Sequence, residues 1–143
     1  MATKKKQFKN PLMRVKLPST EIATDSILKE AQYLHQQGQF EKAQEIYLQV
    51  LEKDSKNAKA IYLLGSIAFQ NSWHLEAVEL IQMAINIRPD DVSFHITCGD
   101  CFFEINQITD ALACYDHAIY LDSKNVLAHY NKGRALKALE QFE

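Results

Sequence analysis

The sequence contains few of the residues that mark disulfide-bonded, membrane-spanning or turn-rich proteins. It has three cysteines, an odd number, all in segments that we predict to be helical. This pattern argues against a disulfide framework and for a reducing compartment, the cytoplasm by default. Four glycines and three prolines are too few for a turn-rich sheet protein. No apolar run approaches the roughly 18–20 residues that cross a bilayer. The sequence therefore predicts a helical, cytoplasmic protein.

Sequence patterns of catalytic and metal-binding sites are also missing. There is no Gly-rich phosphate loop, no GxSxG and no HExxH. Cys98 and Cys101 form a CxxC preceded by His95, but on a helix these three residues fan apart, and no second ligand pair lies nearby. We interpret Cys98, Cys101 and Cys114 as core residues. We therefore expect no catalytic site, no metal and no cofactor in this chain.

The charges are unevenly distributed. Residues 1–20 contain six basic residues and no acidic one, whereas the rest of the chain contains ten basic and 18 acidic residues. Pro11 and Pro18 interrupt any helix there, so residues 1–23 are predicted to form a basic, disordered arm. A solubilising tail is favoured, and contact with an anionic surface is the alternative. Because the body is acidic and only Phe8 lies among the arm's charges, we expect no nucleic-acid partner.

Small residues recur at intervals of 34 positions. The first series is Ala31, Gly65, Gly99 and Gly133, the second is Ala43, Ala77 and Ala111, and Tyr47, Ile81 and Tyr115 form a third. A period of this length is typical of a solenoid, in which each repeat is stable only when it stacks on its neighbours. Glycine inside a helix costs roughly 1 kcal/mol relative to alanine. The recurring glycines therefore indicate close helix crossings.

The period divides the chain into residues 24–57, 58–91 and 92–125 and an incomplete fourth block, 126–143. Each complete block is predicted to contain two helices, with Asn57 and Asp91 as N-caps and breaks at Gly38, Asn71–Ser72 and Asn106. The predicted fold is all-α, a right-handed α-solenoid of stacked antiparallel helix pairs. The incomplete block indicates the N-terminal piece of a longer protein, and a single capping helix is the alternative.

Several positions of the blocks match one repeat family. Leu64-Gly65, Ala77-x3-Ile81 and Pro89 carry the match in the second block, and the third block has Gly99-x2-Phe102 and Ala111-x3-Tyr115. With these residues the blocks resemble tetratricopeptide repeats. The signature Trp position holds Ile27, Ile61, His95 and His129, and we expect both histidines to be packing residues.

The resemblance implies that the first helix of each pair lines a concave groove. The groove residues that it implies are Lys59, Tyr62, Ser66, Phe69, Ile96, Asp100, Phe103, Tyr130, Asn131 and Arg134, with Leu28, Gln32, His35 and Glu104 beside them. Packing between repeats is the alternative role of the aromatic residues. Repeats that bind a C-terminal carboxylate use Lys, Asn and Arg at positions that hold Leu28, Tyr62, Leu63, Ser93 and Thr97 here, so we expect no such clamp. Only Asn131 represents the asparagine ladder of O-GlcNAc transferase arrays.

The function implied by the resemblance is a non-catalytic scaffold that binds a partner peptide or helix in its groove. The opening repeats also resemble those of bacterial multidomain enzymes. This suggests the alternative of an acceptor-recruiting module of an O-GlcNAc-transferase-like glycosyltransferase or a sulfotransferase whose catalytic domain lies beyond Glu143. A small secretion chaperone is a third alternative.

Overall fold

The structure, a computed structural model, describes residues 21–142. Most of the predicted arm, residues 1–20, lies outside these residues. Helix α2 (Glu21–Gln36) includes the expected boundary between arm and array at residue 24. The helical region therefore begins before that boundary, and residues 21–23 are not part of an unstructured arm.

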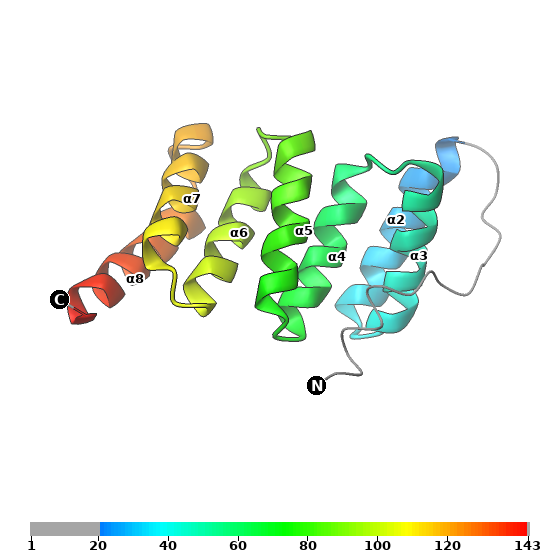
Figure 1. Cartoon of the computed structure of the whole chain (residues 1–143). Coiled ribbons are helices and arrows are strands. Elements are labelled where there is room, and N and C mark those ends of the chain that lie inside the picture. The colour runs from blue at the N-terminus through cyan, green and yellow to red at the C-terminus, as the bar shows by residue number, and fades with distance from the viewer. Residues whose placement is uncertain (1–20, 143) are drawn as a thin grey trace.

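The described residues form seven helices that stack side by side in chain order (Figure 1). After α2 come α3 (Phe40–Lys53), α4 (Ala58–Gln70), α5 (His74–Ile87), α6 (Val92–Glu104), α7 (Ile108–Leu121) and α8 (Val126–Phe142). Each helix packs on the next one in sequence. No strand occurs in residues 21–142, so the all-α prediction is confirmed. None of these helices is both long and apolar enough to span a bilayer.

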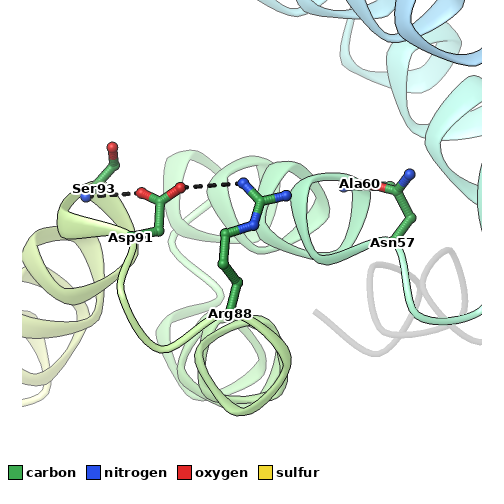
Figure 2. A network of polar contacts seen from close by, with 5 residues as sticks. All are labelled: Asn57, Ala60, Arg88, Asp91 and Ser93. Atoms are coloured by element: carbon green, nitrogen blue, oxygen red, sulfur yellow. Dashed lines mark hydrogen bonds and ion pairs between the residues drawn. The ribbon is translucent and has the colours of Figure 1, made fainter.

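Side-chain caps fix the starts of α4, α6 and α8. The carboxamide oxygen of Asn57 accepts a hydrogen bond from the backbone N–H of Ala60 at 3.0 Å, and Asp91 accepts one from Ser93 at 3.1 Å (Figure 2). Asp91 also forms an ion pair with Arg88 at 3.3 Å. The predicted caps are thus confirmed, and the equivalent Asn125 caps α8 in the same way.

The turns inside the helix pairs share one backbone feature. Gly38, Ser72 and Asn106 have φ angles of 76°, 62° and 62°, and they lie 34 residues apart. This left-handed conformation is easy for glycine and tolerated by asparagine, but it is strained for serine. The breaks predicted at these positions are confirmed.

Close helix crossings explain two of the recurring glycines. A Cβ atom at Gly65 would lie 2.7 Å from Cγ1 of Ile81, and a Cβ at Gly99 would lie 2.5 Å from Cε1 of Tyr115. These distances are far below van der Waals contact, so α4 crosses α5, and α6 crosses α7, at positions where no side chain fits. At Gly133, by contrast, a Cβ would meet nothing within 4 Å.

Of the cysteines and histidines that we expected to pack in the core, all but one histidine do so. Cys98 and Cys101 are buried, and Cys114 is half-buried against the same cluster, which confirms that they pack in the core. His95 is buried as expected, but His129 is exposed, so the expectation that it packs is wrong. The ring of His95 contacts His117 on the following helix, whereas no helix follows α8 among the described residues.

The stacking is tighter on one side of the array than on the other. Helix α4 contacts both α2 and α6, and α6 contacts α8, whereas the backbones of α3, α5 and α7 do not approach one another as closely. An array whose helices are closer on one side curves toward that side. Helices α2, α4, α6 and α8 therefore form the inner face, and α3, α5 and α7 form the outer face.

Candidate functional site

Polar side chains join neighbouring helices along the inner face. The Nε2 atom of His35 hydrogen-bonds Oε1 of Gln70 at 2.8 Å, between α2 and α4. The Tyr62 hydroxyl lies 3.1 Å from Oγ1 of Thr97, between α4 and α6. Because each bond links residues of successive repeats, these contacts hold the inner helices at fixed spacing and register.

Asp100 is the centre of the polar contacts between α6, α7 and α8. Its Oδ1 atom accepts hydrogen bonds from the Tyr115 hydroxyl at 2.6 Å and from Nδ2 of Asn131 at 2.8 Å. Burial raises the pKa of Asp100, while these two hydrogen bonds and the nearby Arg134 guanidinium act in the opposite direction. One carboxylate oxygen is therefore used to hold the fold together, and Asn131 is committed to the same contact.

Phe103 and Arg134 form a second contact between α6 and α8. The guanidinium carbon of Arg134 lies 4.9 Å from the centre of the Phe103 ring, which is within the range of a cation–π interaction. Phe103 is half-buried and Arg134 is exposed, as is the neighbouring Glu104. This part of the inner face offers an aromatic surface bordered by charges of both signs.

A pocket of about 290 Å³ opens between α4, α6 and the start of α8. It is lined by Tyr62, Val92, Ser93, Ile96, Thr97, Asn125 and Leu127. The Tyr62 ring stacks on Phe94 with centroids 4.5 Å apart, so this wall of the pocket is rigid. The lining is mainly apolar and includes the hydroxyl groups of Tyr62, Ser93 and Thr97 and the carboxamide of Asn125, which suits an aliphatic or aromatic side chain of a bound segment.

The other predicted groove residues differ in how accessible they are. Lys59 and Phe69 are half-buried, Tyr130 is 64% exposed, and Ile96 is 6% exposed at the pocket wall. Ser66 donates its hydroxyl hydrogen bond to the Tyr62 carbonyl of its own helix at 3.0 Å. Beside them, Gln32 and His35 are half-buried, whereas Leu28 lies in the core and offers nothing to a ligand.

Several residues around the inner face were not among the predicted groove residues. The pocket is also lined by Val92, Ser93, Thr97, Asn125 and Leu127. Tyr115, from the outer helix α7, holds Asp100 in place. The 34-residue series had assigned Tyr115 to packing only. In the sequence, the one sign of a further role was the Tyr115 hydroxyl, because the equivalent Ile81 has none. Only the fold shows that Asp100 lies within hydrogen-bond distance of that hydroxyl.

Two family models match the chain. The model described as anaphase-promoting complex, cyclosome, subunit 3 matches residues 37–118, more than half of the chain, and a TPR repeat model matches residues 99–139. Together with the helix pairs and their 34-residue period, these matches decide the family. The chain belongs to the tetratricopeptide repeat (TPR) family. A search of curated proteins gave no significant match.

Solved TPR structures share this fold at low sequence identity. The first TPR of Spaghetti (RPAP3) bound to an HSP90 peptide is 16% identical, with a TM-score of 0.77 over 82% of this chain and 93% of that one. An O-GlcNAc transferase mutant from Thermobaculum terrenum is 22% identical, with a TM-score of 0.77 over 83% of this chain and 23% of the enzyme. MamA is 20% identical, with a TM-score of 0.75 over 82% and 68%. At these identities the likeness establishes the TPR fold.

Proposed function

We propose that the inner face of this TPR array binds an extended or helical segment of a partner protein and catalyses no reaction. The observation that carries the proposal is the small apolar pocket at Tyr62, Ile96 and Leu127, which lies on the same face as Phe103 and Arg134. A partner segment would place one apolar side chain in the pocket and lie along the aromatic surface. Buried apolar and aromatic anchors of this kind supply most of the binding energy in protein interfaces.

The proposed ligand differs from a chaperone C-terminus. The structurally similar RPAP3 domain is bound to an HSP90 peptide. In this chain, the positions of the carboxylate clamp hold residues without positive charge, including Tyr62 and Thr97, which bond to each other. We therefore propose that selection rests on an apolar side chain in the pocket and not on a terminal carboxylate.

The test is a selection of peptides from a displayed library, followed by affinity measurements on matched variants. Leu127→Glu places a charge at the pocket, where Leu127 is 54% exposed, and Leu75→Glu makes the same change at a leucine that is 62% exposed on the outer helix α5. We expect Leu127→Glu and Phe103→Ala each to weaken binding by at least about 30-fold, the equivalent of about 2 kcal/mol. Leu75→Glu should leave binding unchanged. Equal losses from Leu127→Glu and Leu75→Glu, or no loss from either, would contradict the proposal.

A second candidate is that the array recruits acceptor proteins for a transferase domain of the same polypeptide. It is supported by the Thermobaculum terrenum O-GlcNAc transferase, in which the matched region is only 23% of a much longer enzyme. Reading the open frame beyond Glu143 tests this arrangement. A nucleotide-sugar-binding or sulfotransferase domain would support it, and a stop codon would leave the free-standing scaffold.

A further inference from the structure

A second pocket, of about 490 Å³, opens on the outer face between α5 and α7. Its walls include Gln82 from α5, His95 and Cys98 from α6, and Cys114 and His117 from α7. Because the backbones of the outer helices lie farther apart than those of the inner helices, side chains fill the space between them. Here thiols and imidazoles border that space, away from the inner face.

The previous pair of outer helices shows what normally fills this space. One repeat earlier, the positions of Gln82, Cys98 and Cys114 hold Leu48, Leu64 and Leu80. Leu64 is buried in the first core cluster, and Leu48 and Leu80 pack against it. Replacing three leucines by a polar side chain and two short thiols leaves the pocket open and brings reactive groups to its wall.

The fold brings together two cysteines that lie 16 residues apart in sequence. Helices α6 and α7 lie close together where Gly99 meets the Tyr115 ring. Cys98 and Cys114 immediately precede these two residues, and both line the pocket and pack in the same apolar cluster. Cys101, the other half of the CxxC, is fully buried and does not line the pocket. The two cysteines that share the pocket are therefore Cys98 and Cys114, and not the Cys98 and Cys101 of the CxxC motif.

The two sulfur atoms have different surroundings. The neighbouring Cys98 thiol lowers the pKa of Cys114 in spite of its partial burial, whereas the interaction with Cys114, together with burial, raises the pKa of Cys98. Cys114 is half-buried at the pocket wall, whereas Cys98 is 1% exposed. The Cys114 thiolate is therefore the sulfur that a small reagent in the pocket reaches first.

We propose that Cys98 and Cys114 are a peroxide-sensitive modification site, with Cys114 as the attacking sulfur and Cys98 as the resolving thiol. The Cys114 thiolate attacks one oxygen of hydrogen peroxide, an S–O bond forms as the O–O bond breaks, and the departing hydroxide takes up a proton to leave as water. Cys98, as its thiolate, then attacks the Cys114 sulfenic acid. The S–S bond forms as the S–O bond breaks, and the hydroxide leaves as water with the proton from Cys98. Two thiols are oxidised to one disulfide, and one peroxide is reduced to two waters.

The disulfide would join α6 to α7 beside Asp100, within the third repeat. It would tie the helix that carries Asp100 and Phe103 to the helix whose Tyr115 holds Asp100 in place. This site does not depend on the proposed function of the inner face.

The test treats the reduced full-length chain with hydrogen peroxide, blocks the remaining thiols with iodoacetamide and maps the peptides by mass spectrometry. We expect an intramolecular Cys98–Cys114 disulfide, with Cys101 recovered as the alkylated thiol. Cys101→Ser should form the same disulfide, and Cys114→Ser should form none. Cys98→Ser should leave a Cys114 sulfenic acid that dimedone traps.

Two further measurements separate reactivity conferred by the fold from ordinary thiol chemistry. In the folded chain, iodoacetamide should modify Cys114 at least about tenfold faster than Cys101, because the two thiols differ in pKa and in access. In 8 M urea this selectivity should disappear. A disulfide that includes Cys101, three free thiols after peroxide treatment, or equal alkylation rates of Cys114 and Cys101 in the folded chain would overturn the proposal.

Discussion

Helices α6 and α8 occupy equivalent places in consecutive repeats, yet the same sequence positions have opposite surroundings. Gly99 of α6 lies against the Tyr115 ring, whereas Gly133 of α8 faces open space. Ile96 is 6% exposed, and its equivalent Tyr130 is 64% exposed. Helix α6 packs against α4, α5, α7 and α8, but α8 contacts only α6 and α7 among the described residues.

The histidines at the signature Trp position show the same contrast. His95 and His129 each bond through Nε2 to a backbone carbonyl six residues earlier, at 2.7 Å and 2.8 Å. Only His95 is buried, because His117 of the following helix covers it. The comparison shows that a repeat position acquires its energetic role from the next helix in the stack.

The largest expected effect is that of Gly99→Ala. The new Cβ would lie 2.5 Å, 2.8 Å and 2.9 Å from three atoms of the Tyr115 ring, which is buried and held by its hydroxyl to Asp100. Because the ring cannot move aside without losing that bond, we expect a loss of about 3 kcal/mol in the free energy of unfolding, measured by urea denaturation.

Gly65→Ala is the matched control for that substitution. Its Cβ would contact Cγ1 of Ile81 at 2.7 Å, and an aliphatic side chain adjusts more readily than a hydrogen-bonded ring. A loss of about 1–2 kcal/mol is expected. If Gly99→Ala were no more harmful than Gly65→Ala, the Tyr115 ring would not be fixed as we describe.

Asp100 should give the next largest effect. Asp100→Ala leaves the Tyr115 hydroxyl and the buried Asn131 amide without their acceptor, at a cost of about 2 kcal/mol in thermal or urea unfolding. Asp100→Asn keeps an acceptor oxygen and removes a charge that burial disfavours, so its stability should stay close to that of the native chain.

The native chain and Asp100→Asn should also differ in how their stability depends on pH. Burial raises the pKa of Asp100 in the folded state above the value of about 3.9 expected for the unfolded chain. Protonation therefore favours the fold, and the native chain should gain stability relative to Asp100→Asn as the pH falls through the folded-state pKa toward 3.9. A difference between the two that does not change with pH would contradict the raised pKa.

Gly133→Ala should act in the opposite direction. A Cβ at this position meets nothing within 4 Å, and alanine is favoured over glycine inside a helix by roughly 1 kcal/mol. We expect a stability gain of up to about 1 kcal/mol by thermal unfolding. A loss would show that another element covers this face of α8 in solution.

The smallest expected effect concerns His95. Burial is the main cause that lowers its pKa, and His117 contributes in the same direction, while the Pro89 carbonyl and Asp91 oppose it. The folded state therefore favours the neutral ring, and stability should fall as the pH drops below the unfolded value of about 6.5. His95→Gln, which retains a donor for the Pro89 carbonyl, should show less of this loss when unfolding is followed between pH 7 and 5.

The sequence predicted features that depend on local spacing. The 34-residue series identified the helix pairs and the crossings at Gly65 and Gly99, and Asn57 and Asp91 were recognised as caps because an N-cap acts within its own turn. The sequence did not predict that Cys98 and Cys114 line one pocket, because which residues of two helices come together depends on how the helices cross. Likewise, His95 and His129 could not be distinguished from spacing alone.

By itself, the sequence determined that this chain is a stack of helix pairs, since periodicity, caps and turn residues act over one or two turns of the backbone. The tertiary structure decided which equivalent positions are buried, which carboxylate is held by a tyrosine from the next helix, and which thiols share a pocket. The physical reason is that burial, pKa and side-chain contact depend on the neighbouring helices, and those neighbours differ along the array even where the repeat does not.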